Sequence, residues 1–575
     1  MRPPARSRAS NSLLLVLCCG GALLLALARP SGAAAESYAV GVLPGWSAAK
    51  LADRIEATTG SRAKTLLPGA ALEVDAPRAA LENIRGVGFV EVLGKSRKLA
   101  FTTNDPLAPK QWYLTRDKAW DFWPTFPKLA TVKVAVIDSG IDGGHPEFPT
   151  ARIAGSKSFV GGSPLVDTDG HGTFVAGEIA AQQDNGIGIA GLAFPAQLLI
   201  AKVVGPDGEL TLRAEVAAIK WAVAEHASVI NLSLGGVRDP LDRKLDTYSP
   251  LEQAAVDYAF RHNAVVVGAV GNGPQSPHTP WPYAHYPAAL PHVIGVSAVT
   301  QTGAVPAFSN RDQIYNDIAA PGENILSTIP REMTATRPSC ADQGYSPCGP
   351  DEFSHAIGTS FAAPQVSAAA ALVRSVRPDL HPEQVAALLE RTADDANPST
   401  GCSQCPLLRD EFTGWGTLNV QRALQVATAG GAIPPPDRFE TNDGAGAWAY
   451  PMWGAKGRTV RATLDYWDDQ VDVYAVVIRK GQRLYARLNG PGRAGVVVVL
   501  WRPGTREVDG LSAPLSQRAA LSARVGRQER LAFTARRGGT YFLEVKLQTP
   551  GSGSYTLSFS KATPKAKPKK AHRAR

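Results

Sequence analysis

The spacing of apolar residues changes along this chain, and the longest regular pattern lies between residues 131 and 428. Runs of seven or eight mostly apolar residues alternate there with stretches of helical spacing at 212–225, 250–263 and 381–393. Near-continuous apolar strands are typical of a parallel sheet whose two faces are both covered. We therefore expect an α/β domain with a doubly wound, mostly parallel sheet. Its predicted strands are 131–138, 197–204, 228–234, 264–271 and 292–299.

A shorter segment before this domain has a different order of elements. Residues 36–103 predict a strand, a helix, two strands, a helix and a strand, which is the ferredoxin-like order. The predicted strands are 37–43, 63–69, 70–76 and 88–100, and the predicted helices are 47–60 and 76–87.

After the α/β domain, a Gly- and Pro-rich linker at 430–437 leads into short strands in which apolar and polar residues alternate. This pattern continues from residue 438 to residue 560 and predicts an all-β sandwich. Its predicted strands include 472–478, 483–488, 495–501, 529–535, 540–547 and 554–560.

The N-terminus has the composition of a secretory signal peptide. A basic start is followed by an apolar run at 13–28 and by small residues up to Ala35, where we expect cleavage. An uncleaved anchor is the alternative, but the run is short and interrupted by glycine. A lipid anchor on Cys18 or Cys19 is disfavoured by the bulky Leu17. No later run is apolar enough to span a bilayer, so we expect an exported protein without a transmembrane segment.

The length and charge of the chain limit the number of domains and the kinds of partner we expect. A chain of 575 residues is too long for one core and indicates two to four domains. The formal net charge is +9, but four arginines lie in the signal region and seven basic residues lie in the tail 561–575, which leaves −2 between them. We therefore expect no nucleic-acid partner. The tail is expected to be disordered and solvated, with contact to an anionic cell surface as the alternative.

Four cysteines remain once the signal peptide is removed, and export permits disulfides. They allow three connectivities, of which we favour the two pairings between sequence neighbours. A redox or metal role for the Cys-x-x-Cys pair is the alternative, but the strand–helix setting of a redox motif is lacking. The favoured pairs are Cys340 with Cys348 and Cys402 with Cys405.

One serine stands among unusually small residues, in the stretch Gly-Thr-Ser-Phe-Ala-Ala-Pro at 358–364. It is explained either as a helix cap or as a nucleophile at a helix N-terminus. A nucleophile needs a base, a group that orients the base, and donors for an oxyanion. Asp138 ends the first predicted strand of the sheet, His171 starts a helix rich in small residues, and Asn272 follows the strand 264–271. Each residue alone could be a turn or cap residue, but their joint occurrence on one predicted sheet favours catalysis.

Five stretches in this order resemble the subtilisin-like serine proteases: VAVIDSGID, DGHGTFVAG, INLSLGG, GAVGN and GTSFAAP. The resemblance covers about 105–428. It implies that Ser360 is the nucleophile, that His171 is the general base and then the general acid, and that Asp138 orients the imidazole. It also implies an oxyanion hole formed by the Asn272 side-chain amide and the Ser360 backbone N–H.

The resemblance further implies that Ser233, Leu234 and Gly235 pair with substrate backbone as an added strand. Two residues depart from the family pattern: Phe361 stands where many members have methionine, and Phe174 replaces a common second histidine. We expect Phe174 to be neutral packing. The segment lining the main specificity pocket aligns poorly, and we expect His285 near the floor of that pocket.

Calcium is also implied by the resemblance, because the stretch QQDNGIGIAG is similar to a calcium-binding loop of the family. Hard cations prefer oxygen ligands. The implied ligands are the Asn185 side chain and the carbonyls of Ile187 and Ile189, completed by Gln182, Asp105 and Glu147. A metal-free surface turn is the alternative. No organic cofactor is expected.

The flanking segments resemble known accessory domains. Residues 36–103 look like a subtilase propeptide, an intramolecular chaperone and inhibitor, and cleavage is expected between Lys95 and Asp105. A permanent N-terminal domain is the alternative. Residues 438–560 resemble the pre-peptidase C-terminal domain of secreted bacterial proteases, where a role in substrate, matrix or surface binding competes with that of a spacer or stabiliser.

The sequence therefore predicts a secreted serine endopeptidase with a catalytic domain at 104–429, autoprocessed from a proenzyme and acting as a monomer on protein or peptide substrates. A narrow processing protease is the alternative within enzymes. The alternative from another class is a non-catalytic adhesin, against which the four residues Asp138, His171, Asn272 and Ser360 argue together.

Overall fold

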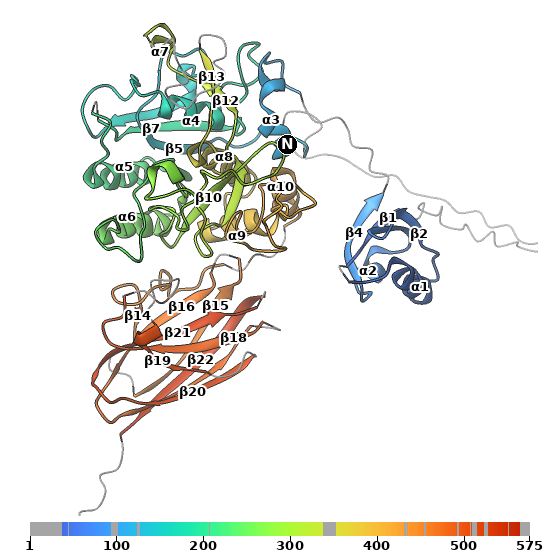
Figure 1. Cartoon of the computed structure of the whole chain (residues 1–575), viewed down its shortest axis with the longest axis vertical. Coiled ribbons are helices and arrows are strands. Elements are labelled where there is room, and N and C mark those ends of the chain that lie inside the picture. The colour runs from blue at the N-terminus through green and yellow to red at the C-terminus, as the bar shows by residue number, and fades with distance from the viewer. Residues whose placement is uncertain are drawn as a thin grey trace, which may run out of the picture. The chain divides into compact units, whose positions relative to one another are not determined.

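The computed structural model describes three long segments of the chain, residues 37–93, 102–336 and 352–563 (Figure 1). Short gaps within them lie at 44, 123–126, 206, 431–432, 434, 453–455, 468, 492–493, 507, 509–514, 523–526 and 550. The predicted signal peptide, both cysteines of the predicted pair Cys340–Cys348 and most of the basic tail lie outside the described residues. The chain divides into two compact units, Met1–Lys98 and Leu99–Arg575.

The first unit has the predicted ferredoxin-like topology. Its strands β1 (Ser37–Val42), β2 (Lys64–Leu67), β3 (Ala71–Asp75) and β4 (Val87–Leu93) form an antiparallel sheet in the order β2-β3-β1-β4. Helix α1 (Ala48–Thr59) buries Leu51 and Ile55 against this sheet. Helix α2 (Arg78–Leu81) is only one turn long, much shorter than the predicted 76–87. Residues 82–86 form turns instead, and Gly86 takes a φ of 107° directly before β4 begins at Val87.

The second unit begins with an α/β domain whose central sheet has seven strands, all parallel, as the apolar runs predicted. The spatial order is β11-β10-β9-β8-β5-β7-β6. The strands are β5 (Val132–Asp138), β6 (Ile153–Ser158), β7 (Ala196–Lys202), β8 (Val229–Leu232), β9 (Val265–Ala269), β10 (Val293–Val299) and β11 (Ile318–Pro321).

Helices cover both faces of this sheet, so each strand is buried on both sides. In β5, Val134 and Val136 face a core that contains α4 (His171–Ala180), α8 (Ala363–Val376), α9 (Pro382–Arg391) and α10 (Val420–Ala429). Ala135 and Ile137 face a second core with α5 (Leu212–Ala224) and α6 (Pro250–Arg261). Successive side chains of a strand point to opposite faces, so a strand between two helical layers must be apolar throughout.

Smaller elements complete this domain. These are α3 (Trp112–Arg116), α7 (Arg331–Thr336) and an antiparallel pair, β12 (Ile325–Thr328) and β13 (Phe353–Ala356). Cys402 and Cys405 form the predicted disulfide, and both are buried beside Val299 and Ala319. The predicted pairing of these two cysteines is therefore confirmed. Within the described part of the chain, none of the helices combines the length and the apolar character that crossing a bilayer requires.

The C-terminal part is a β-sandwich, as predicted (Figure 1). One sheet has the order β14-β16-β21-β18-β19 and the other β15-β22-β17-β20, and a shared core packs between them. The strands are β14 (Tyr450–Pro451), β15 (Gly457–Asp465), β16 (Val471–Ile478), β17 (Arg483–Asn489), β18 (Val496–Trp501), β19 (Arg518–Leu521), β20 (Gln528–Thr534), β21 (Gly539–Leu547) and β22 (Ser552–Ala562).

Candidate active site

Asp138 and His171 form a hydrogen-bonded pair at the carboxyl end of the parallel sheet. Asp138 is the last residue of β5 and is 2% exposed, and His171 is the first residue of α4. His171 Nδ1 lies 2.9 Å and 3.0 Å from the two carboxylate oxygens of Asp138. Since Nδ1 faces the carboxylate, it donates there, and Nε2 of the same ring is left for another partner.

Local sequence brings these two elements unusually close. A Cβ on Gly172 would lie 2.2 Å from the carbonyl oxygen of Gly140 and 3.1 Å from Cβ of Asp138, so only glycine permits this approach. The start of α4 is held by Asp167, whose carboxylate accepts hydrogen bonds from the backbone of Gly170 and Thr173. Anionic side chains at a helix N-terminus satisfy its free N–H groups. The cap therefore fixes His171 in position.

The environment of His171 favours its charged form. Burial opposes that form, but the charge of Asp138 and the hydrogen bond to it outweigh burial and raise the pKa of His171 to about 9. The imidazole side chain is still 27% exposed. An imidazole held in this way can take up a proton at Nε2 and keep the resulting charge beside a carboxylate.

Ser360 lies in a 3₁₀ turn, Thr359–Phe361, directly before α8. Its carbonyl oxygen accepts a hydrogen bond of 2.7 Å from Ser233 Oγ. Ser233 Oγ in turn accepts from Asn231 Nδ2 at 2.9 Å, and Asn231 Oδ1 accepts from Ser367 Oγ at 2.8 Å. Asn231 and Ser367 are fully buried. This chain of hydrogen bonds fixes the backbone that carries Ser360 to the end of β8.

Asn272 is tied to the same turn through its neighbour Thr359. Asn272 Oδ1 accepts hydrogen bonds from Thr359 N at 3.0 Å and from Thr359 Oγ1 at 3.2 Å. Thr359 Oγ1 accepts from Gly271 N at 3.1 Å. Because Thr359 holds the oxygen of the amide, the Nδ2 group points the other way. It donates a hydrogen bond to Gln275 Oε1 at 3.2 Å.

Several of these residues line one cleft of about 410 Å³. This volume is in the range of small-ligand sites. Among the lining residues are His171, Asn272, Ser360 and the predicted substrate-binding stretch Ser233, Leu234 and Gly235. One wall is closed by two backbone hydrogen bonds of 2.9 Å between Gly236 and Tyr286. The structure therefore gathers into one cleft His171, Asn272, Ser360 and the predicted substrate-binding stretch, and Asp138 is buried and hydrogen-bonded to His171.

His285 also lines the cleft. It is 4% exposed, and its Nε2 lies 2.8 Å from Ser276 Oγ. Burial lowers the pKa of His285 to about 4, so the ring is neutral at neutral pH. Gly271 lies against the ring, since a Cβ there would be 2.5 Å from it. His285 thus adds a polar, uncharged group to the lining of the cleft.

The implied calcium ligands form only part of a cage. Asp105 and Glu147 are buried, and Asn185 links them, because its N donates to Asp105 Oδ1 at 3.0 Å and its Nδ2 to Glu147 Oε2 at 3.0 Å. Ile189 N donates to Glu147 Oε1 at 2.8 Å.

Gln182 makes a different contact, because the Arg152 guanidinium donates a hydrogen bond to its Oε1 at 2.7 Å. Ile187 donates its N–H to Asn185 Oδ1 at 2.9 Å.

Burial raises the pKa of Glu147 to about 8, with the charge of Asp105 adding to the shift. Two buried carboxylates close together fit a hard cation by their donor chemistry. The contact between Gln182 and Arg152 does not fit, because it places a guanidinium beside one of the implied ligands. The side chains of Asp105, Glu147 and Asn185 thus meet at one place in the loop, whereas the Gln182 side chain is hydrogen-bonded to Arg152.

Sequence reasoning missed the positioning residues Asp167, Asn231, Thr359 and Ser367. For two of them a signal is present: Asn231 interrupts an apolar strand, and Ser367 interrupts an alanine-rich helix. A polar residue at such a buried position requires a hydrogen-bond partner. Which partner it has depends on the packing of β8 against α8 and cannot be read from spacing.

Comparison with known proteins shows which family this chain belongs to. Residues 130–416 match the model of the Subtilase family. The major intracellular serine protease of Bacillus subtilis (strain 168) is 37% identical over 265 residues, which cover 45% of this chain and 73% of that protein. Subtilisin E of the same strain is 35% identical over 298 residues, covering 52% and 66%. Subtilisin of Bacillus pumilus is 35% identical over 298 residues, covering 52% and 92%. The chain thus belongs to the subtilase family of serine proteases and is a subtilisin-like serine endopeptidase.

Proposed function

We propose that this endopeptidase is exported as an inactive precursor and cuts peptide bonds through an acyl-enzyme on Ser360. The observation that carries the proposal is the convergence of Ser360, Asn272 and the Asp138–His171 pair on one cleft. A nucleophile, an oriented base and an oxyanion donor are the parts that acyl transfer from a peptide requires.

The steps follow from these positions. The Ser360 hydroxyl gives its proton to His171 Nε2 while Oγ forms a bond to the carbonyl carbon of the substrate. The carbonyl oxygen becomes an oxyanion that accepts hydrogen bonds from Asn272 Nδ2 and the Ser360 N–H. His171 then gives the proton to the leaving amine as the carbon–nitrogen bond breaks. Water attacks the ester by the same route, with its proton passing through His171 to Ser360 Oγ.

Asp138 keeps its charge throughout these steps. Its carboxylate accepts from His171 Nδ1, which fixes the tautomer and stabilises the imidazolium that forms. For Asn272 Nδ2 to reach the oxyanion, it must leave Gln275, an exchange of one hydrogen bond for a stronger one to a charged oxygen.

The flanking parts are proposed to act as their resemblance implies. Residues 36–103 serve as an inhibitor and folding template that the enzyme removes, with cleavage between Lys95 and Asp105. The β-sandwich serves in substrate, matrix or surface contact. A calcium ion at the Asp105–Glu147 loop would be held by these two carboxylates, by Asn185 and by the carbonyls of Ile187 and Ile189, and would stabilise the loop without taking part in the reaction.

The test compares maturation of the wild type with that of Ser360→Ala. We expect intact mass and N-terminal sequencing to show loss of residues up to about 104 in the wild type and their retention in the variant. A serine-directed phosphonate should label the wild type alone. Equal cleavage of both proteins would assign processing to an outside protease, and absence of phosphonate labelling would favour the non-catalytic adhesin. A narrow substrate profile against a peptide library would favour the processing protease.

A further inference from the structure

Two buried polar side chains join the helix that carries His171 to the turn that carries Ser360. Glu178 lies near the end of α4, the helix that His171 begins, and Gln365 lies in the first turn of α8, directly after the Ser360 turn. Both are 0% exposed. Gln365 Nε2 donates to Glu178 Oε2 at 3.0 Å. Neither residue takes part in the steps of acyl transfer proposed above.

The amide nitrogen of Gln365 also holds the backbone beside Ser360. Nε2 lies 2.7 Å from the carbonyl oxygen of Phe361, the residue after Ser360, and 2.8 Å from that of Pro321, at the end of β11. Backbone carbonyls can only accept, so the nitrogen of the amide must face them, and this fixes the orientation of the amide. Since Ser233 Oγ holds the carbonyl of Ser360 itself, the carbonyl groups of Ser360 and Phe361 are both tied to side chains of other elements.

One oxygen on each of the two side chains is left over. Glu178 Oε1 and Gln365 Oε1 are buried, and neither forms a hydrogen bond with the described part of the chain. Buried polar atoms nearly always have a partner. Two oxygens can bond to each other only if one of them carries a hydrogen atom. A proton on the Glu178 carboxyl would supply that hydrogen, because a neutral carboxylic acid is both a donor and an acceptor.

The surroundings of Glu178 favour its protonated form. Among the described residues, no lysine, arginine or histidine forms an ion pair with Glu178, and another fully buried carboxylate, Asp117, adds negative charge. Burial raises the pKa of Glu178 well above its usual range and outweighs the hydrogen bond from Gln365, which lowers it. The charge of Asp117 raises the pKa further. A buried carboxylate without a cation is costly, so the carboxyl keeps its proton.

We propose that Glu178, in its protonated form, and Gln365 are positioning residues that hold Ser360 in place relative to His171. This role rests on the proposed function, since it concerns the same nucleophile and base. Gln365 Nε2 donates to Glu178 Oε2, and the proton on Glu178 Oε1 is donated to Gln365 Oε1, so that acid and amide form a closed pair of two hydrogen bonds. The pair joins α4 to the turn before α8, and neither residue lines the cleft.

Such a pair affects the rate of the reaction more than the binding of substrate. A displacement of about 1 Å between reacting groups can cost roughly 10²-fold in rate. The stretch Ser233–Gly235, which is predicted to pair with substrate backbone, follows β8, whereas the pair lies between α4 and α8. Loss of the pair should therefore lower kcat and change KM little.

The test compares four variants of the mature full-length enzyme with the wild type on one peptide substrate. Gln365→Met and Glu178→Met remove the hydrogen bonds with little change in volume, and kcat should fall at least about tenfold in each. Glu178→Gln keeps a neutral group that can donate and accept, so its kcat should stay within a few-fold of the wild type. Gln253→Met is the matched control, because Gln253 is a buried glutamine of α6 that donates to the carboxylate of Asp257 at 2.7 Å and does not line the cleft. Its kcat should match that of the wild type.

Two readouts separate positioning from a loss of folded enzyme. Labelling to completion by a serine-directed phosphonate counts the active sites, so that kcat is expressed per labelled Ser360. Infrared difference spectra between Ser360→Ala and the same protein with Glu178→Gln report the proton without turnover or maturation. We expect the second substitution to remove the carbonyl band of a protonated carboxyl group and no carboxylate band.

An unchanged kcat per labelled site in Gln365→Met, or an equal fall in Gln253→Met, would overturn the proposal. So would the loss of a carboxylate band on Glu178→Gln substitution, because the carboxyl group would then be ionised. A wild type that takes up no phosphonate would overturn the proposed function itself, whereas a labelled wild type with unaffected variants would overturn the role of Glu178 and Gln365 alone.

Discussion

Phe361 packs against the imidazole of His171, with ring centroids 5.4 Å apart and planes at 45°. The residue that follows the proposed nucleophile therefore also contacts the proposed base. Phe174 extends the contact, since its ring centroid lies 4.5 Å from that of Phe361. The two departures from the family pattern thus form one aromatic cluster on His171, and the expected packing role of Phe174 is confirmed.

The cluster predicts resistance to mild oxidants. Phenylalanine has no thioether, whereas a methionine at this position would be oxidised to a polar sulfoxide beside His171. In dilute hydrogen peroxide, we expect Phe361→Met to lose activity at least several times faster than the wild type, measured as residual hydrolysis of a peptide substrate over time. The sequence has three methionines. One of them, Met333, packs against Gly170, the residue before His171, because a Cβ on Gly170 would lie 2.6 Å from the Met333 sulfur. Met333→Leu is therefore the control for loss through that sulfur, and equal loss by wild type and Phe361→Met would contradict the prediction.

The raised pKa of His171 predicts an alkaline pH profile. His171 must be neutral to accept the proton of Ser360, so kcat/KM should rise with pH through the pKa of this group. Burial lowers this pKa, but the charge of Asp138 and the hydrogen bond to it outweigh burial and raise it to about 9. In Asp138→Asn the two largest raising effects are lost and only the weaker charges of Asp169 and Asp167 oppose burial, so the pKa should fall toward or below about 6.5. We also expect kcat to fall by roughly 10⁴ because the tautomer is no longer fixed.

Proton NMR of His171 in Ser360→Ala measures this pKa without turnover. The same rise in the pKa of His171 determines how this residue makes the stability of the folded protein depend on pH. A histidine whose pKa is raised on folding adds stability below its unfolded pKa of about 6.5, and this contribution is lost as the pH rises through about 9. A midpoint below 6.5 in the folded protein would contradict both expectations.

Asn272→Ala is expected to reduce kcat by about 10²–10³ with little change in KM, because Nδ2 meets the oxygen only when it becomes charged. Gln275→Ala is the matched control. It removes the present partner of Nδ2 and leaves the amide held by Thr359, so its kcat should stay within a few-fold of the wild type. Steady-state kinetics on one peptide substrate decides the matter, and a comparable loss of kcat in both variants would show that the amide acts through positioning alone.

His285 predicts a restricted pocket. The ring fills space against Gly271, so His285→Gly should open the floor of the cleft. We expect kcat/KM for substrates with phenylalanine before the scissile bond to rise relative to those with alanine, by roughly tenfold or more. A matched series of peptide p-nitroanilides measures this ratio. His278→Ala is the control, since His278 is exposed and bonds only to the nearby Pro280 carbonyl. An unchanged ratio in His285→Gly would place the floor elsewhere.

The residues at the ends of the parallel strands show best which parts of the site the sequence predicts. Asp138 and Asn272 could be placed because each follows an apolar run long enough to be a buried parallel strand, and the carboxyl ends of such strands share one edge. The pair β12 and β13 could not be placed in this way. Each strand has four residues, and they lie about 25 residues apart in the sequence, so their pairing depends on tertiary packing.

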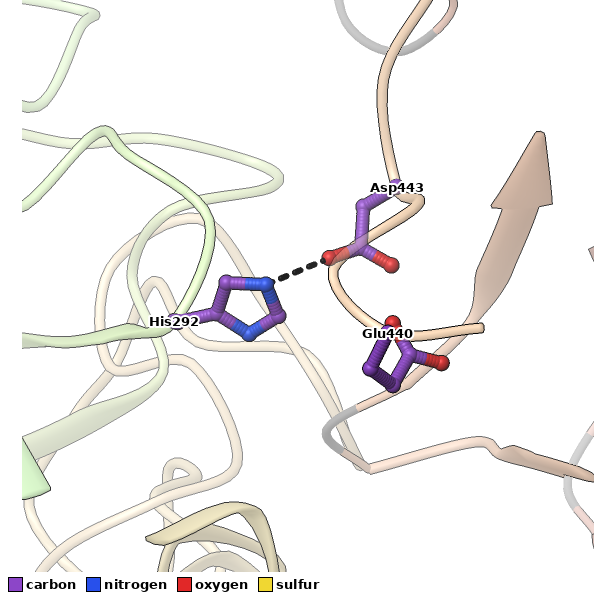
Figure 2. A group of neighbouring side chains, drawn as sticks. All are labelled: His292, Glu440 and Asp443. Carbon is purple, nitrogen blue, oxygen red and sulfur yellow. Dashed lines mark ion pairs between the residues drawn. The ribbon is translucent and has the colours of Figure 1, made fainter. Parts of the chain in front are cut away.

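The same limit applies to side chains that meet across domains or between layers. Ser233 was singled out for substrate binding, but its hydroxyl holds the carbonyl of Ser360, a contact between residues 127 positions apart. His292 Nε2 lies 3.0 Å from Asp443 Oδ2 (Figure 2), although the two residues are far apart in the sequence and no spacing rule joins them. Gln182 was expected in the calcium loop, but the nearby Arg152 competes for its side chain. A charge supplied by a distant element is not visible in a local motif.

The calcium loop gives the last prediction. Glu147 is buried with its pKa raised to about 8 by burial, so its ionised form is costly at neutral pH unless a cation compensates it. We expect millimolar Ca²⁺ to slow thermal inactivation at pH 7 and EGTA to reverse the effect. Glu147→Gln should lose most of this response, because a neutral amide attracts the ion less than a carboxylate does.

Glu209→Gln is the control for this experiment, since Glu209 is an exposed carboxylate outside the loop and its variant should respond to calcium as the wild type does. A second variant separates the loop from other ions. Arg152→Met removes the guanidinium that now donates to Gln182 Oε1, frees that oxygen, and should tighten calcium binding measured by calorimetry. If neither variant changes the response to calcium, the protection comes from another site, and the loop is held by the hydrogen bonds to Asp105 and Glu147 without an ion.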